Sequence, residues 1–258
     1  MRPALAALFI LVGAFAPAAT SVADGLAATV ARVKPSIVGV GTHQATRRPP
    51  AALQGTGFVI GDGRYVLTTF HVVNEELDAK NRETLVVFVG QGQEVELRPA
   101  KVVVADANHD VAVLAIDGGA LPALVLGDDG QVAEGDEIAF TGFPIGAVLG
   151  LYPATHRGIV AAWTPIAIPA IAPRQLDVTM IERLDEEDFL VFQLDATAYP
   201  GNSGSPLYLA TTGAVVGIVS SVFVKTTKEN VLSDPSGISY AIPIRYARAL
   251  LDEAGIGF

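Results

Sequence analysis

Residues 84–116 read TLVVFVGQGQEVELRPAKVVVADANHDVAVLAI, and short runs within this stretch decide the fold class. The runs are TLVVFVG (84–90), AKVVVA (100–105) and DVAVLAI (110–116), and Gly, Asp and Asn lie between them. β-Branched side chains pack well on a pleated sheet, whereas Gly, Asp and Asn favour turns. The stretch therefore predicts consecutive short strands rather than a helix.

The same pattern continues on both sides of this stretch. The further runs are SIVGVG (36–41), TGFVI (56–60), YVLTTF (65–70), DEIAFTGF (136–143), RGIVAAW (157–163), FLVFQLDA (189–196), PLYLA (206–210), AVVGIVSSVFV (214–224) and ISYAIPI (238–244). About a dozen short strands with turn residues between them and little helical spacing predict an all-β sandwich or barrel architecture.

Helical spacing is confined to the two flanks of this strand series. Asp24 is expected to cap a first short helix, which Pro35 would stop. The stretch IRYARALLDEAGIG, which starts at Ile244, predicts a closing helix with Gly255 as its C-terminal stop. One helix is therefore expected to follow the last strand.

A connection between two groups of strands is expected at ALPALVLGDDGQVAEG (120–135). We therefore predict an N-terminal lobe over residues 24–130 and a C-terminal lobe over residues 131–258. Irregular surface loops are expected at residues 43–54 and at the Pro-rich, acidic residues 164–188. A solvated loop is the preferred interpretation of the acidic run in the second of these.

The first residues have the features of a secretory signal peptide. A positive start at residues 1–3 precedes an apolar run over residues 4–16, and residues 21–23 read Ser-Val-Ala. We predict a signal peptide over residues 1–23, with cleavage after Ala23 and export of the mature chain. Because the apolar run is shorter than the roughly 20 residues of a membrane-spanning helix, no permanent membrane span is expected.

The amino-acid composition and the net charge exclude several kinds of functional site and binding partner. The chain has no cysteine, which excludes disulfides, thiolate metal sites and cysteine nucleophiles. Its formal net charge is −10, and it has no basic run of the kind that nucleic-acid binding requires. We therefore expect no metal, no cofactor and no nucleic-acid partner.

The stretch AYPGNSGSPL (198–207) places Ser203 among small, turn-forming residues. Such residues suit any tight turn, so the stretch alone does not separate a structural serine from a nucleophile. A serine nucleophile needs a general base, usually a histidine that is oriented by a carboxylate. All the histidines precede Ser203, and Gly201 to Ser205 read GNSGS rather than the G-x-S-x-G of α/β-hydrolases, in which the histidine follows the serine. That class is therefore excluded.

His71 and Asp110 are the preferred partners of Ser203. His71 follows an apolar strand, and Asp110 begins the apolar run DVAVLAI, where a buried carboxylate needs a partner. Asp106 is the alternative carboxylate. His109 is expected to be a surface residue, because successive residues of a strand point to opposite faces.

The remaining histidines are not expected to take part in the chemistry. His43 and His156 fall in stretches that we interpret as solvent-exposed loops, and neither has metal-type spacing. His71 is therefore the candidate base.

The order His71, Asp110, Ser203 matches the chymotrypsin-type order. The motifs GTGFVI, YVLTTFHVV, DANHDVAVLAI, FTGFPIG, GIVAA, YPGNSGSPL, GIVSS and ISYAIPI follow in the order found in bacterial trypsin-like serine proteases. The chain thus resembles this family, and within it the protease domain of the HtrA (Deg) group. The resemblance implies two six-stranded antiparallel β-barrels with a C-terminal helix.

The resemblance also implies a mechanism. Ser203 would attack the peptide carbonyl, His71 would transfer the proton, and Asp110 would orient the imidazole. The N–H groups of Gly201 and Ser203 would form the oxyanion hole. This describes an exported serine endopeptidase that acts on protein or peptide substrates. Two alternatives remain open, namely a protease-fold binding or chaperone-like protein with a resting triad, and an esterase that uses the same residues.

The chain departs from the HtrA pattern at two positions of the serine motif. Tyr199 and Ser205 stand where that group usually has Asn and a second Gly. The sequence ends at Phe258, so PDZ-linked regulation is expected to be absent. HtrA-type domains often trimerise near the mature N-terminus, which leaves a homotrimer open.

The resemblance places the substrate pocket near Thr197, with Val219 and Ser220 on one wall. None of these side chains offers the buried carboxylate that a preference for Lys or Arg requires. We therefore predict cleavage after small or medium apolar residues.

Overall fold

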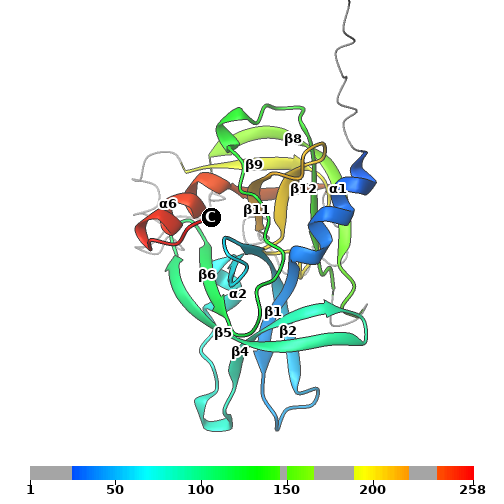
Figure 1. Ribbon diagram of the computed structural model, residues 1–258. Coiled ribbons are helices and arrows are strands. Elements are labelled where there is room, and N and C mark those ends of the chain that lie inside the picture. The colour runs from blue at the N-terminus through cyan, green and yellow to red at the C-terminus, as the bar shows by residue number, and fades with distance from the viewer. Residues whose placement is uncertain (1–24, 146–149, 166–188, 221–236) are drawn as a thin grey trace, which may run out of the picture.

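The computed structural model describes residues 25–145, 150–165, 189–220 and 237–258. The expected signal peptide and most of the expected loop at 164–188 lie outside these ranges. Within them, the chain forms two closed antiparallel barrels of six strands each, followed by a helix (Figure 1). The predicted all-β fold with two six-stranded barrels is therefore confirmed.

The first barrel has the strand order β1-β2-β3-β6-β5-β4 and closes between β4 and β1. Its strands are β1 (Ile37–His43), β2 (Ala51–Ile60), β3 (Tyr65–Thr68), β4 (Thr84–Gln91), β5 (Glu94–Asp106) and β6 (Val111–Ile116). The opening stretch thus forms β4, β5 and β6. The sequence missed the polar first half of β5, which pairs with β4 from Gln91 opposite Glu94 onward.

The predicted loop at residues 43–54 is shorter than expected. His43 pairs with Ala51 across the β1–β2 hairpin, so only residues 44–50 lie outside the two strands. The Arg and Pro residues in this stretch suggested a long irregular loop. Antiparallel pairing extends into it because the hairpin closes over a short turn.

The second barrel has the strand order β10-β11-β12-β9-β8-β7 and closes between β7 and β10. Its strands are β7 (Glu137–Gly142), β8 (Ala154–Pro165), β9 (Leu190–Asp195), β10 (Pro206–Leu209), β11 (Val215–Ser220) and β12 (Ile238–Pro243). Closure leaves no free strand edge among these residues, which removes a template for pairing with other chains.

Side chains on the two faces of a strand pack in two different hydrophobic cores. In β2, Val59 packs inside the first barrel, while Phe58 and Ile60 belong to a cluster that also holds residues of the second barrel and of both flanking helices. Successive residues of a strand point to opposite faces, so a strand buried on both faces shows a continuous apolar run. This seam between the barrels is where the candidate site lies.

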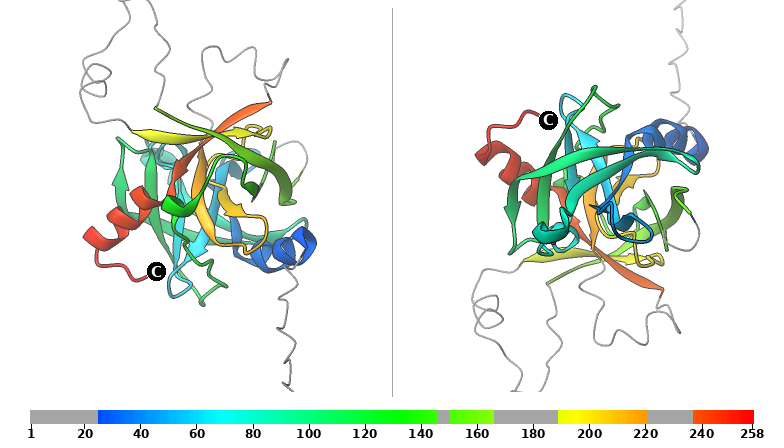
Figure 2. Two further views of the ribbon diagram at one scale, coloured as in Figure 1. Left: turned by 90° about the horizontal axis from the view of Figure 1, so that it is seen from above. Right: turned by 90° about the horizontal axis from the view of Figure 1, so that it is seen from below.

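Two helices flank the barrels on opposite sides (Figure 2). Helix α1 (Leu26–Val33) buries Thr29 and Val33, and the Arg32 side chain donates to the carbonyl of Thr212 in the turn between β10 and β11. Helix α6 (Ile244–Glu253) follows β12 and confirms the expected closing helix.

A buried carboxylate fixes the start of α6. Asp129 is 2% exposed, and it accepts a hydrogen bond from the N–H of Arg245 at 3.0 Å as well as a contact from the Arg245 side chain. A negative charge at a helix N-terminus is favourable because the first N–H groups lack helical partners. Asp129 lies in the stretch 120–135 between the barrels, so this pair ties that connection to α6.

Candidate active site

His71 lies on α2 (Phe70–Val73), a single helical turn that follows β3. The sequence predicted a strand as far as Phe70, but β3 ends at Thr68 and Thr69 begins the turn. The N–H of Phe70 donates to the carbonyl of Asp110 at 3.1 Å, which fixes the helix beside the start of β6. The His71 side chain is 25% exposed, so its ring remains accessible from solvent.

Asp110 holds His71 through both backbone and ring. Its carboxylate accepts from the backbone N–H of His71 at 2.9 Å, and the His71 Nδ1 lies 2.8 Å from Oδ2 and 3.0 Å from Oδ1. The hydroxyl of Ser220 donates to Oδ2 at 2.9 Å. A buried carboxylate is costly without such donors, and Asp110 is 8% exposed. These donors therefore satisfy the charge in place.

The carboxylate also selects the form of the imidazole. Because Asp110 only accepts hydrogen bonds when ionised, the neutral ring of His71 carries its proton on Nδ1. Nε2 is then left with a lone pair. This is the tautomer that a general base requires.

Ser203 lies in a tight turn that packs against the first barrel. It is 3% exposed, and its carbonyl accepts from the N–H of Thr56 in β2 at 2.8 Å. The next residue, Gly204, has a φ of +87°, and a Cβ there would lie 1.9 Å from the carbonyl oxygen of Thr56 and 2.5 Å from the Thr68 hydroxyl. Only glycine allows this approach. The GNSGS turn thus rests on the strands that lead to His71.

A chain of hydrogen bonds connects this turn to Asp110. The N–H of Gly204 donates to the carbonyl of Val219 at 2.8 Å, and the N–H of Val219 donates to the carbonyl of Ser205 at 2.9 Å. The next residue, Ser220, donates its hydroxyl to Asp110. The structure therefore connects the turn of Ser203 to Asp110, and through Asp110 to His71, across the seam.

The backbone around Gly201 is fixed on both sides. The N–H of Ile145 donates to the carbonyl of Pro200 at 2.7 Å, and the Thr56 hydroxyl donates to the carbonyl of Gly201 at 2.7 Å. Gly201 has a φ of +97°. In a trans peptide the N–H and the preceding carbonyl point in opposite directions, so the Gly201 N–H points away from Ile145.

Two side chains of the same turn lack hydrogen bonds within the described part of the chain. Asn202 and Ser205 are both fully buried, and neither the Asn202 amide nor the Ser205 hydroxyl has a partner there. Leaving a buried polar group unsatisfied costs roughly 1–3 kcal/mol. The turn beside Ser203 is therefore held by its backbone rather than by these side chains.

The three predicted pocket residues have different surroundings. Thr197 is partly exposed, and the Ser239 hydroxyl bridges its neighbours by donating to the Ala196 carbonyl at 2.7 Å and accepting from the Ala198 N–H at 2.8 Å. Val219 is fully buried in the core of the second barrel. Sequence reasoning missed Ser239, because only the pairing of β12 with β9 brings it beside Thr197.

The side chain of Ser220 makes a contact that the sequence did not reveal. We expected it on a pocket wall, but its hydroxyl is committed to Asp110. The spacing of 110 residues carries no local signal. This contact depends on the register between the two barrels.

The other histidines are more buried than predicted. His156 lies in β8, not in a loop, and its ring stacks on Phe140 with centroids 4.9 Å apart; burial lowers the pKa of His156. His43 ends β1 and is partly buried. His109 contacts Asp106 rather than lying free on the surface. Asp106, the alternative carboxylate, is therefore paired with His109, whereas Asp110 contacts His71.

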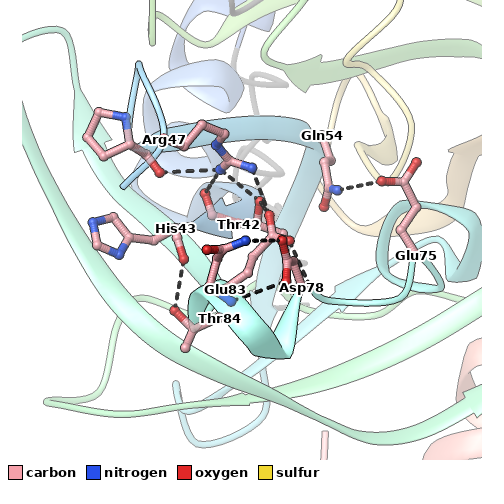
Figure 3. A network of polar contacts seen from close by, with 10 residues as sticks. Thr42, His43, Arg47, Gln54, Glu75, Asp78, Glu83 and Thr84 are labelled. Carbon is pink, nitrogen blue, oxygen red and sulfur yellow. Dashed lines mark hydrogen bonds and ion pairs between the residues drawn. The ribbon is translucent and has the colours of Figure 1, made fainter. Parts of the chain in front are cut away.

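A polar network links Thr42 of β1 and the β1–β2 turn to residues 78–83, which precede β4 (Figure 3). Arg47 in the β1–β2 turn contacts Glu83 at 2.7 Å, and the Thr42 hydroxyl donates to the same carboxylate oxygen at 2.6 Å. The bond from Thr42, then that from the N–H of Asp78, and the Arg47 guanidinium hold the pKa of Glu83 below its ordinary value of 4.5. The network joins the turn to the segment that follows α2.

That segment has a further anchor nearer to His71. Gln54 of β2 donates to Glu75 at 3.1 Å, and Glu75 lies two residues beyond the end of α2 (Figure 3). The helical turn is therefore held at its start by the Phe70 contact and beyond its end by residues 75–83. Such support restricts the orientation of the His71 ring.

Other kinds of site find little support in the described ranges. They contain no group of three or more His, Asp or Glu side chains arranged to hold a metal ion. No helix within them is long and apolar enough to cross a bilayer.

Two closed barrels with a histidine, an aspartate and a serine gathered at their seam define the chymotrypsin-like class of proteins. The family described as trypsin-like peptidase domain matches residues 55–218. The chain belongs to this family.

Two curated relatives carry the same name. A protein from Halomonas elongata, named "Probable periplasmic serine endoprotease DegP-like", is 33% identical over 199 residues, which cover 77% of this chain and 34% of that protein. A protein of the same name from Chlamydia trachomatis is 32% identical over 217 residues, which cover 83% of this chain and 37% of that protein. The chain thus spans about a third of the length of these relatives.

Solved structures agree with this assignment. "HtrA-type protease AlgW with tripeptide" superposes with a TM-score of 0.61 at 26% identity, covering 89% of this chain and 63% of that one. The serine endoprotease from Yersinia pestis superposes with a TM-score of 0.60 at 26% identity, covering 91% of this chain and 68% of that one. The predicted resemblance to trypsin-like proteases of the HtrA group is confirmed.

Proposed function

We propose that this chain is a serine endopeptidase in which Ser203 is the nucleophile, His71 the general base and Asp110 the orienting carboxylate. The observation that carries the proposal is the Asp110 carboxylate, which receives His71 from one barrel and Ser220 from the other. The same carboxylate thus fixes the imidazole of His71 and connects it to the barrel that carries Ser203. Membership of the trypsin-like peptidase family supports the same assignment.

The reaction proceeds through an acyl-enzyme. The Ser203 Oγ attacks the peptide carbonyl carbon while its proton passes to His71 Nε2, and the carbonyl oxygen becomes the oxyanion. His71 then gives the proton to the leaving amine as the C–N bond breaks. Water repeats the sequence on the ester, which releases the acid and restores Ser203.

The oxyanion is received by the N–H groups of Gly201 and Ser203. The contacts of the Pro200 and Gly201 carbonyls hold the peptides on either side of Gly201, which supports a preformed site. Each such donor contributes on the order of a hundredfold or more to turnover.

The substrate side chain enters beside Thr197 and is small or medium in size and apolar. Thr197, Val219 and Ser239 carry no charge, and Ser220 is engaged by Asp110. Since these described residues provide no free charge, they do not compensate the desolvation of Lys, Arg or Glu. Rapid cleavage after those residues and none after Val, Ala or Leu would overturn this specificity.

The protein acts outside the cytoplasm on protein or peptide substrates. The signal peptide expected at residues 1–23 supports export. The relatives from Halomonas elongata and Chlamydia trachomatis are named periplasmic, which favours that compartment.

The nucleophile is tested by labelling the mature chain with a fluorophosphonate and mapping the adduct by mass spectrometry. We expect labelling at Ser203 that disappears in Ser203→Ala and falls steeply in His71→Ala. Thr212→Ala, in a turn remote from the site, is the matched control and should label like the wild type. A folded wild-type chain that does not label would contradict the proposal and favour a binding or chaperone-like protein with a resting triad.

A further inference from the structure

A second histidine and carboxylate pair lies in the turn that leads into Asp110. The His109 Nδ1 lies 2.5 Å from Asp106 Oδ2, and the N–H groups of Asn108 and His109 donate to Asp106 Oδ1 at 2.9 and 3.1 Å. Burial raises the pKa of Asp106, but the donors from His109 outweigh it and leave the pKa below its ordinary value. The ionised carboxylate thus closes the turn between β5 and β6.

The His109 ring reaches across the seam. It stacks on Tyr246 of α6 with centroids 4.2 Å apart and an interplanar angle of 18°, and Phe189, next to β9, meets it edge-on at 4.9 Å. Phe189 also meets Tyr246 edge-on at 4.9 Å. Aromatic contacts of this kind are favourable beyond the area they bury. The stack therefore joins a turn of the first barrel to two elements that adjoin strands of the second.

The residue after His109 has a strained backbone. Asp110 has a φ of +55°, which is uncommon outside glycine and persists only where the surroundings enforce it. On one side of Asp110 the Phe70 N–H holds its carbonyl. On the other side the Asp106 turn and the His109 stack hold the chain that precedes it.

We propose that His109 is a positioning residue for the triad, and this proposal rests on the proposed function. The His109 ring, held against Tyr246 and Phe189, fixes the position of the β5–β6 turn and so the direction of the Asp110 carboxylate. The stack acts through Asp110 and does not touch substrate. Because His71 and Asp110 belong to the first barrel and Ser203 to the second, it also fixes the two barrels relative to each other at the triad.

The groups that face His109 are Asp106 in its own turn and Tyr246 in α6, with Arg245 and Asp129 beyond Tyr246. Burial raises the pKa of Tyr246, so its phenol stays neutral at neutral pH. Tyr246 therefore brings no change of charge to the stack at neutral pH.

The test compares His109→Ala, His109→Phe and Tyr246→Ala in the full mature chain, with Tyr152→Ala, an exposed aromatic away from the stack, as the matched control. We expect His109→Ala and Tyr246→Ala to lower kcat on a peptide substrate by about ten- to a hundredfold with little change in KM. His109→Phe keeps a ring on Tyr246 and should recover most of the loss. The double alanine variant should lose no more than the single ones.

A second readout does not depend on turnover. We expect the proton between His71 Nδ1 and Asp110 to give a far-downfield ¹H NMR resonance that broadens or shifts in His109→Ala and is restored in His109→Phe. An unchanged kcat and an unchanged resonance in folded His109→Ala would overturn the positioning role. So would equal losses in the alanine and phenylalanine variants. If the wild type shows the resonance but does not hydrolyse peptides, the proposed function fails while the positioning role is still decided by the resonance.

Discussion

The turn between β5 and β6 takes part in two pairs of a histidine and an aspartate, and these two pairs have different surroundings. The pair of His71 and Asp110 joins residues 39 apart in sequence, whereas His109 and Asp106 are three apart in a single turn. The side chains of the first pair are 25% and 11% exposed, and those of the second are 31% and 27% exposed. The residue types are the same, so only position separates them.

The difference shows what makes such a pair chemically useful. Asp106 is satisfied by donors of its own turn, and this pair forms wherever the turn forms. Asp110 takes donors from α2 of its own barrel and from β11 of the other barrel, so its full set of donors exists only when both barrels are assembled. The non-local pair is connected to the turn of Ser203 through Ser220, and the local pair closes the turn that precedes Asp110.

The largest difference between the pairs is expected from the matched substitutions Asp110→Asn and Asp106→Asn. Asparagine at 110 favours the wrong tautomer of His71, so kcat should fall by roughly 10⁴-fold. Asparagine at 106 still accepts the N–H groups of its turn, and kcat should fall less than about tenfold. Steady-state kinetics on a peptide substrate measures both. Similar losses in the two variants would remove the distinction drawn here.

A smaller effect is expected from Ser220→Ala, which removes the donor that the second barrel gives to Asp110. A hydrogen bond to a charged group contributes about 1.5–3 kcal/mol, so kcat should fall by about tenfold or more. Ser239→Ala is the contrast, because its hydroxyl lies beside Thr197 and the change should appear mainly in KM. A KM effect in Ser220→Ala with kcat intact would return Ser220 to the pocket wall.

The smallest effect concerns the stability that Asp106 contributes. Because its folded pKa lies below the ordinary value of 3.8, its contribution is fully present above that value and is lost as the pH falls through the folded pKa. The Tm of Asp106→Asn should therefore lie slightly below that of the wild type at pH 6, and the two should converge in acid. Glu94→Gln, at an exposed position, serves as the charge control. A Tm difference that stays constant with pH would contradict a paired carboxylate at 106.

The strands of the barrels could be predicted from the sequence because many of them are short, continuous apolar runs. The run DVAVLAI is apolar on both faces, as a strand buried between two cores must be, and TLVVFVG is a similar apolar run that contributes Leu85 and Val87 to the core of the first barrel. Prediction failed where polar residues pair, as in residues 94–99 of β5 and at His156 in β8. There, tertiary pairing overrides local composition.

The site was predictable in its order of residues and not in its supports. The order His71, Asp110, Ser203 with the GNSGS turn indicates the chemistry, because few arrangements of these residue types occur. The contacts of Ser220 with Asp110 and of His109 with Tyr246 depend on how the barrels meet. No periodicity or spacing in the sequence indicates directly how the two barrels pack against each other.

The division of the triad between the barrels has a mechanical consequence. Since the proposed base and its carboxylate belong to one barrel and the proposed nucleophile to the other, the rate of the proposed reaction depends on how far the barrels slide or tilt against each other. A shift of about 1 Å in such a geometry costs on the order of a hundredfold in rate. The rate of hydrolysis should therefore respond to small displacements between the two barrels. A molecule that binds far from the substrate site and separates the barrels would inhibit hydrolysis without competing with substrate.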